Sequence, residues 1–280
     1  MKTKPKIAFL SCYSGIVSRG VETFEYEMSK RLAKKFDVTV FCGGNCKIRP
    51  NIKVVSKKTF FTTPSASLNP LRMFFLDLQS LKILFFTIKF IPYLLKNRYE
   101  IVVTLNGGWQ TFLTRIVSKI TKSKLIVTGQ AGIGFYDLVN IFFRPDTYVA
   151  LTSDQQKWAK HLAPEANVVK IPNGVDLAKF NPKAAAAIVN LEKPIVVCCS
   201  ALDKHKRVDL TIKAVARTNM SLLLIGDGEL KGQMDALGKR LLGKKYLRIS
   251  VPYEKIASYY RQGDVFTMVS ETEAFGIAYV

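Results

Sequence analysis

The chain has 280 residues, of which 48% are hydrophobic and 11% aromatic, and it carries a formal net charge of +21. This length allows two ordinary domains, and this composition excludes a disordered chain, which would have too little apolar surface to bury. The only histidines, His161 and His205, leave almost no material for catalysis by a Ser-His-Asp or Cys-His group.

The positive charge is distributed unevenly along the chain. Residues 1–173 hold 26 Lys and Arg against 10 Asp and Glu, a balance of +16, whereas residues 174–280 hold 16 against 11, a balance of +5. A polyanionic partner should therefore meet the first part. Nucleic-acid binding is an alternative, but the basic residues are spread over many segments, with little aromatic interleaving and no known reader module.

The cysteines and the amino terminus indicate a reducing compartment. The five cysteines lie mostly in apolar, strand-like runs, and Cys42 and Cys46 have no second pair or histidine nearby to complete a metal site. Only four apolar residues precede Ser11, too few for the core of a signal peptide. We expect a cytoplasmic protein.

Short apolar runs alternate with longer helix-patterned segments, which is the pattern of βα units around parallel sheets. Strands are predicted at residues 7–10, 38–42, 101–105, 125–128, 148–151, 195–200, 222–225, 247–251 and 265–269. A further strand from Val168 breaks at Pro172 and turns at Asn173 and Gly174. We predict an α/β protein with two Rossmann-like parallel-sheet domains, residues 1–173 and 174–280, and a short helix start or connector at residues 184–187.

Residues 71–95 form the longest apolar segment, but Asp77, Lys82 and Lys89 interrupt it, and a membrane span requires roughly 20 apolar residues in a row. We predict a helix that does not cross a bilayer. Lys82, Lys89 and Lys96 recur every seven residues and so share one stripe of this helix. Two interpretations are open: a helix packed on its own sheet with a solvated lysine edge, or a helix in the interface of an anionic membrane.

Ligands of parallel α/β sheets bind beyond the carboxyl ends of the strands, and glycines mark two of these places. Gly15 and Gly20 lie in the turn before the helix predicted at residues 21–34, where free N–H groups favour an anion. Gly226 and Gly228 follow the strand at residues 222–225 in the same way. Each turn taken alone is also explained by ordinary chain reversal.

Two further strand ends carry charge. Lys204, His205, Lys206 and Arg207 precede a helix predicted at residues 208–216, and such a cluster suits a diphosphate, although a solvated basic loop is the alternative. After the strand at residues 265–269, the next helix is expected to open at residues 271–276. This places Glu273 and the N–H groups of Phe275 and Gly276 at the same edge of the sheet, where they suit sugar hydroxyls and an anion.

The order and spacing of these stretches resemble the family-4 glycosyltransferases, which have the GT-B fold of two facing Rossmann-like domains. The resemblance runs through nearly the whole chain and rests on five segments, at residues 20–22, 171–176, 204–214, 223–229 and 273–276. It implies a retaining hexosyltransferase of polysaccharide biosynthesis that moves a sugar from a nucleotide diphosphate donor to a glycan or lipid-linked acceptor. A GT-B epimerase or hydrolase acting on a nucleotide sugar is the alternative.

The resemblance also implies the site residues. The catalytic residues would be Lys206, Arg207 and Glu273, with the two cations stabilising the leaving diphosphate. Donor-binding residues would be Gly15, Gly20, Gly226, Gly228, Phe275 and Gly276, and the acceptor side would hold Asn106, Gly107 and Gln130. No cofactor or metal is expected, since the sequence has no Asp-x-Asp pair. A peripheral position at the inner face of the plasma membrane is a hypothesis.

The chain departs from the family pattern at three places. Ala201 stands where the family has an arginine, and the loop at residues 128–134 has Gln130 but no histidine, so it offers a hydrogen bond without a proton donor. The family's second glutamate, which follows Glu273 after seven intervening residues, would fall just beyond Val280. We expect the chain to be a fragment that ends inside its donor-binding motif, inactive and weakly stable as it stands.

Overall fold

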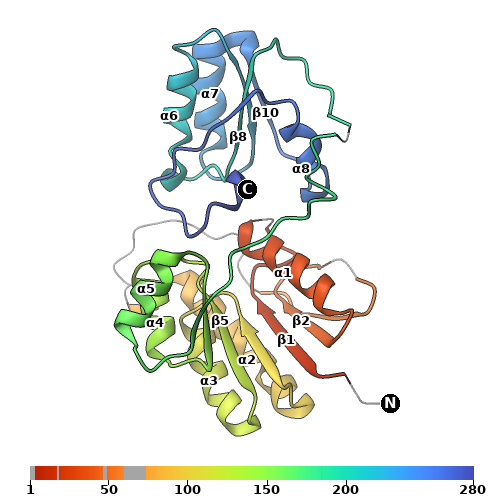
Figure 1. The fold of residues 1–280 in the computed structure, drawn as a ribbon, viewed down its shortest axis with the longest axis vertical. Helices are drawn as coiled ribbons and strands as arrows, with labels where there is room; N and C mark the ends of the chain where they lie inside the picture. Colours follow the sequence, from red (N-terminus) through yellow and green to blue (C-terminus); the bar gives the residue numbers. More distant parts are fainter. Residues whose placement is uncertain (1–3, 18, 47–48, 60–73, 184) are drawn as a thin grey trace. The chain divides into compact units, whose positions relative to one another are not determined.

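The protein was analysed as a computed structural model that describes residues 4–17, 19–46, 49–59, 74–183 and 185–280. The chain divides into two compact units, Met1–Asn173 and Gly174–Val280, at the turn where the sequence places the domain boundary. Each unit is a parallel β-sheet with helices packed against it (Figure 1). The predicted α/β fold class is therefore confirmed.

The first unit contains seven described strands in the order β3-β2-β1-β4-β5-β6-β7, all parallel. Their bounds are β1 Lys6–Ser11, β2 Asp37–Cys42, β3 Ile52–Ser56, β4 Ile101–Thr104, β5 Lys124–Thr128, β6 Thr147–Ala150 and β7 Val168–Lys170. The helices are α1 Gly20–Leu32, α2 Leu78–Asn97, α3 Trp109–Thr121, α4 Phe135–Phe142 and α5 Ser153–Leu162. This strand order is that of the doubly wound nucleotide-binding fold.

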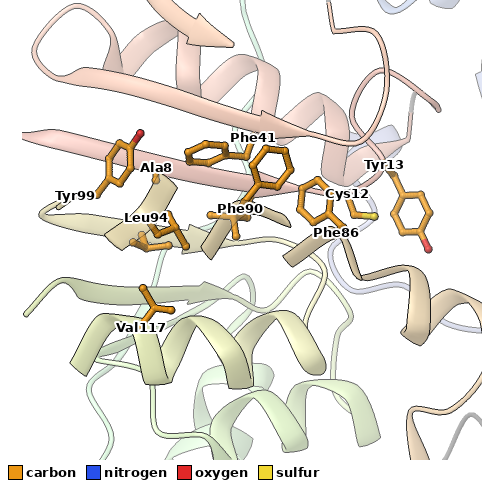
Figure 2. Close-up of a cluster of buried hydrophobic side chains, with 11 residues drawn as sticks. Ala8, Cys12, Tyr13, Phe41, Phe86, Phe90, Leu94, Tyr99 and Val117 are labelled. Atoms are coloured by element: carbon orange, nitrogen blue, oxygen red, sulfur yellow. The ribbon is translucent and has the colours of Figure 1, made fainter. Parts of the chain in front are cut away.

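Alternation along the central strand divides the core of the first unit into two layers. Ile7 and Phe9 pack on the side of α1, while Ala8 and Leu10 pack on the side of α2. Figure 2 shows the second layer, in which the ring of Phe41 from β2 meets rings from α2. The Phe41 and Phe90 ring centroids are 4.8 Å apart, so α2 is a core helix of this unit.

Helix α2 is also the one described helix whose length and composition would suffice to span a membrane, although a third of its most apolar window is buried. It begins at Asp77, whose carboxylate accepts the N–H groups of Gln79 and Ser80. Its buried face includes Phe86, Phe90 and Leu94.

The solvated lysine edge predicted for α2 is wrong at Lys82. Lys82 is 3% exposed, with its ammonium 4.7 Å from the centroid of the Tyr13 ring, because the cation packs on the ring face instead of facing water. Lys89 Nζ donates to the carbonyl of Lys58, and Lys96 is exposed. The outward face is apolar instead, with large exposed fractions on Leu78, Phe85, Ile88 and Leu95.

The second unit contains four described parallel strands in the order β10-β9-β8-β11. Their bounds are β8 Ile195–Cys199, β9 Ser221–Ile225, β10 Tyr246–Ile249 and β11 Val265–Phe266. The helices are α6 Val208–Val215, α7 Lys231–Leu242 and α8 Tyr253–Tyr260, with 3₁₀ turns η2 Lys204–Lys206, η3 Gly243–Lys245 and η4 Ile277–Tyr279. Helices α6 and α7 cover one face of the sheet, where Ile212 and Met234 join Val196 and Leu224 in a common core.

Several predicted elements differ from those observed. Strand β3 was not predicted, because Lys53 interrupts its apolar run at the edge of the sheet. Strand β11 is only two residues long, and residues 271–276 open no α-helix but lead into the single turn η4. Residues 185–187 belong to no helix or strand, which agrees with the predicted connector and not with a helix start. The Ala187 N–H donates to the carbonyl of Ser258, and residue 184 lies outside the described residues.

Candidate functional site

Each sheet has one point at which the chain reverses its direction of strand addition. In the first unit it lies between β1 and β4, and in the second between β8 and β11. Loops at the carboxyl ends of such neighbouring strands diverge, which opens a crevice for ligands.

In the second unit, the loops after β8 and β11 are joined by ion pairs. Lys206 Nζ lies 2.5 Å from Glu273 Oε1, and Arg207 Nη1 lies 2.9 Å from Glu271 Oε1. The Glu271 N–H also donates to the carbonyl of His205. The structure thus brings the predicted catalytic residues Lys206 and Glu273 together, although they are 67 positions apart in sequence, and Arg207 directly follows Lys206.

The basic loop is shaped by the residues around it. Asp203 accepts the N–H of Lys206 and starts η2, and Arg207 then takes a left-handed conformation at φ 46° before α6 begins. The hydrogen bond from Arg207 lowers the pKa of Glu271 below its ordinary value. The cations are therefore neutralised by carboxylates, and an incoming anion must replace these partners.

Glu271 was missed by the sequence analysis, because the segment that carries the resemblance begins at Glu273. Its importance comes only from the pairing of β11 with β8, which brings residues 265–266 beside 196–197. The contact between Glu271 and Arg207 therefore depends on the tertiary structure alone.

Gly226 and Gly228 face the protein's own backbone. A Cβ atom at Gly226 would collide with the carbonyl of Ser200, and one at Gly228 would collide with that of Leu202. The two loops are also joined by the hydrogen bond from the Leu202 N–H to Asp227. Glycine is thus required for the packing of these loops, and donor binding by the two residues stays a prediction.

Phe275 and Gly276 follow the acidic loop. Gly276 is buried at φ 73°, and a Cβ there would lie 2.8 Å from the ring of Tyr279, so this turn requires glycine. Phe275 is partly buried. Their predicted contact with the donor is not tested by these positions.

A cavity of about 590 Å³ lies between α6 and α7 of the second unit. Lys204, Arg207 and Arg240 line it together with Leu202 and Leu237. It shares Arg207 with the ion-pair cluster but includes neither Lys206 nor Glu273.

In the first unit, the glycine turn before α1 has two different parts. Gly15, at φ 80°, packs against the backbone of residues 44–46, where a Cβ would not fit. Gly20 opens α1, and no described atom lies within 4 Å of the place that a Cβ would take, so its backbone is accessible. The turn is fixed by the Arg19 N–H, which donates to Glu22, and burial raises the pKa of Glu22 to about 7.

A cavity of about 240 Å³ in the first unit brings together the predicted acceptor-side residues Asn106, Gly107 and Gln130. Asn106 Oδ1 accepts the Cys12 N–H at 2.7 Å and so joins the ends of β1 and β4. Gln130 exchanges two hydrogen bonds of 3.2 Å with the amide of Asn173. The cavity therefore lies at the reversal point of this sheet.

Asp137 lines the same cavity and was missed by the sequence analysis. It is 1% exposed and accepts hydrogen bonds from Asn140 and Gln155. Burial raises its pKa to about 6, against the lowering effect of these donors. No sequence signal marks it, because a single Asp in a short apolar helix is typical of a solvated position.

Among the described residues, no group of three or more His, Cys, Asp and Glu is arranged to hold a metal ion. Cys42, buried at the end of β2, donates its thiol to the carbonyl of Gly44 at 3.5 Å.

Comparison with known proteins agrees with this architecture, and the fold is of the GT-B class. The Anabaena protein HepE, solved with UDP and glucose, matches 98% of this chain and 77% of its own, with a TM-score of 0.70 at 16% identity. The pneumococcal O-GlcNAc transferase GtfA, solved with UDP and GlcNAc, matches 98% and 81%, with a TM-score of 0.68 at 11% identity.

Residues 181–280 match the family model of glycosyl transferases group 1, and this match lies within the second unit. A component of the phosphatidylinositol N-acetylglucosaminyltransferase of Arabidopsis thaliana is 25% identical over 199 residues, 63% of this chain and 44% of that protein. A GDP-mannose-dependent phosphatidylinositol monomannoside mannosyltransferase of Mycolicibacterium smegmatis is 24% identical over 136 residues, 44% of this chain and 36% of that protein. The matched regions thus span less than half of either relative.

Proposed function

We propose that the chain belongs to a retaining glycosyltransferase of family 4 that moves a hexosyl group from a nucleoside diphosphate donor to a lipid-linked acceptor. The observation that carries this proposal is the ion-pair cluster of Lys206, Arg207, Glu271 and Glu273 at the reversal point of the second sheet. A nucleotide sugar has a diphosphate for the cations and sugar hydroxyls for a carboxylate.

In this mechanism the donor divides the Lys206–Glu273 pair. The diphosphate takes the ammonium of Lys206 and the guanidinium of Arg207, and Glu273 accepts hydrogen bonds from the sugar. When the bond from C1 to the diphosphate breaks, the electron pair stays on the phosphate oxygen, next to both cations. The acceptor hydroxyl bonds to C1 on the same face and transfers its proton to that oxygen, which gives retention.

The acceptor proposal is supported by the names of the two relatives, both of which contain phosphatidylinositol. The exposed apolar face of α2 supports peripheral contact with a membrane, where Phe85 and Ile88 would enter the interface beside the exposed Lys96. A cytoplasmic protein at the inner face of the plasma membrane would meet such an acceptor.

Product analysis with a donor labelled in the sugar tests the proposed reaction. Transfer gives a labelled acceptor with the donor's anomeric configuration, whereas hydrolysis gives free sugar and epimerisation gives a new nucleotide sugar without any acceptor. Label that reaches only free sugar or a second nucleotide sugar would contradict the proposal.

Vesicle sedimentation tests the membrane contact separately. The double variant Phe85→Ser/Ile88→Ser should sediment less with vesicles containing phosphatidylglycerol than the parent chain does. Equal sedimentation of the two proteins, or equal binding to neutral and anionic vesicles, would refute it.

A further inference from the structure

We propose that the cavity between α6 and α7 binds a phosphate monoester with an apolar body, and that this phosphate competes with Glu271 for Arg207. The two helices lie side by side on one face of the second sheet (Figure 1), and the cavity between them measures about 590 Å³. Pockets for small organic ligands measure about 300–1,000 Å³, so this one can hold a whole ligand. Such a ligand would be neither donor nor acceptor, and its binding does not rest on the proposed function.

An apolar stripe runs along the α7 side of the cavity. Leu230, Met234 and Leu237 line it at helical spacing, and Leu230 and Leu237 are only partly buried. Leu202 and Val208 also belong to the lining and are buried. The unbranched methionine side chain adapts its shape to an apolar neighbour. The stripe can therefore cover the apolar body of a ligand.

Positive charges outnumber negative charges around this stripe. The charged lining residues are Lys204, Arg207, Lys213 and Arg240 against Asp203 and Asp209, and four positive charges minus two negative charges leave +2. A phosphate monoester carries about −1.5 to −2 at pH 7, whereas a carboxylate carries only one negative charge. The excess charge of the lining therefore matches a phosphate monoester more closely than a carboxylate.

The carboxylates of the lining already have partners within the protein. Asp203 accepts the Lys206 N–H at 3.3 Å, and Asp209 lies 2.9 Å from Lys213 Nζ. The side chains of Lys204 and Arg240, both exposed residues, have no hydrogen bond or ion pair within the part of the chain that the structure describes. An anion entering the cavity would thus meet cations that no carboxylate neutralises.

Arg207 connects this cavity with the ion-pair cluster. Its backbone is left-handed at φ 46°, and it makes one hydrogen bond, of 2.9 Å, to Glu271. The two side chains are 35% and 47% exposed, and ion pairs this accessible to solvent are weak. A phosphate offers two oxygens to the guanidinium, and such two-point contacts are stronger. Phosphate in the cavity should therefore draw Arg207 away from Glu271.

Calorimetry on the whole chain at pH 7.5 tests the ligand class, with hexyl phosphate, inorganic phosphate and hexanoate as probes. Hexyl phosphate should bind at least about tenfold more tightly than inorganic phosphate, because only its chain reaches the apolar stripe. Hexanoate should bind at least about threefold more weakly than hexyl phosphate, because it has one charge less. No binding of hexyl phosphate, or binding no tighter than that of inorganic phosphate or hexanoate, would overturn the proposal.

A matched pair of variants locates the bound phosphate. Lys204→Gln should bind hexyl phosphate at least about fivefold more weakly than Lys255→Gln does. Lys255 is an exposed lysine of α8, whose tyrosines pack on the other face of the sheet, so its loss changes the net charge equally without touching the cavity. Binding by the two variants within about twofold of each other would overturn the proposal.

Vesicle sedimentation distinguishes a soluble monoester from the head of a lipid. If the phosphate belongs to a lipid, Lys204→Gln should sediment less than Lys255→Gln with vesicles that contain phosphatidic acid. Equal sedimentation of the two variants, together with their different affinities for hexyl phosphate, would identify a soluble ligand.

Replacing Glu271 tests the competition for Arg207. Glu271→Gln should bind hexyl phosphate about two- to fivefold more tightly than Glu192→Gln, because only the first variant frees the guanidinium. Glu192 is an exposed residue before β8, so its replacement removes the same charge away from the cavity. Equal affinities of the two variants, or weaker binding by Glu271→Gln, would overturn the proposal.

Discussion

Replacing Lys206 by methionine removes the cation of the candidate donor site while keeping a side chain of similar length. In the free protein this cation lies 2.5 Å from Glu273, and both side chains are about a quarter exposed. A diphosphate oxygen in the carboxylate's place would be equally close. Two unit charges about 4 Å apart interact by about 4 kcal/mol at an effective dielectric constant of about 20, and loss of one oxyanion donor costs about 2.7–4 kcal/mol. We expect kcat/KM to fall by about 10²–10³.

Replacing the partner of Lys206 should change the affinity for nucleoside diphosphate in the opposite direction, which makes it the more decisive test. Glu273→Gln removes the partner that competes with the diphosphate for Lys206, and a partly exposed ion pair is worth up to about 1 kcal/mol. Nucleoside diphosphate should therefore bind up to about fivefold more tightly to Glu273→Gln, while transfer falls because the sugar loses its carboxylate. Lys206→Met should weaken the same ligand.

The assays are initial rates with labelled donor and calorimetric titration of the nucleoside diphosphate. Lys193→Met is the matched control, because Lys193 precedes the amino end of β8, whereas the cluster follows its carboxyl end, and Lys193 pairs with Asp264 at 3.1 Å. The reasoning is refuted if Lys206→Met keeps kcat/KM within about threefold of the parent, or if Lys206→Met and Glu273→Gln shift diphosphate affinity in the same direction.

Three further predictions concern the stability of the first unit. Arg49→Met should lower the free energy of unfolding by about 3–5 kcal/mol, because Glu25, which is 1% exposed, loses its paired charge. Urea titrations measure this loss, and a loss under about 1 kcal/mol would contradict the prediction. The raised pKa of Glu22, about 7 against 4.5, means that stability present below pH 4.5 is lost as pH rises through 7, about 3 kcal/mol in all. Glu22→Gln should flatten this slope in melting temperatures between pH 5 and 8, and parallel slopes would refute the assignment. Phe90→Ala should lower the free energy of unfolding by about 3–5 kcal/mol, because Phe90 is fully buried, whereas Phe85→Ala should lower it by under about 0.5 kcal/mol, because Phe85 is half-exposed. Equal losses in the two variants would show that α2 is not packed as described.

Most strands could be predicted because each is a short apolar run buried on both faces of a parallel sheet. Strand β3 was not predicted, because an edge strand needs less apolar sequence and Lys53 interrupts its apolar run. Strand β11 was predicted too long for a related reason. It also lies at the edge of its described sheet, so the apolar residues after Phe266 need not continue the ladder.

The candidate sites were predicted where they depend on strand order and missed where they depend on packing. Asn106 and Gln130 follow β4 and β5, which are neighbours, so their meeting in one cavity follows from the topology. The seven-residue spacing placed Lys82 correctly on its helix but not against Tyr13, since the spacing contains no information about the opposing ring. The burial of Asp137 likewise depends on donors from other elements.

The net charge of the first unit and the charge of its cavity have opposite signs. Residues 1–173 carry a balance of +16, yet the described lining of the cavity includes Asp77 and Asp137 and neither lysine nor arginine. A long-range field acts on a molecule as it approaches the surface, whereas a cavity selects the group that enters it. Attraction to anionic vesicles should then weaken as salt is added, because salt screens the long-range field of the first unit.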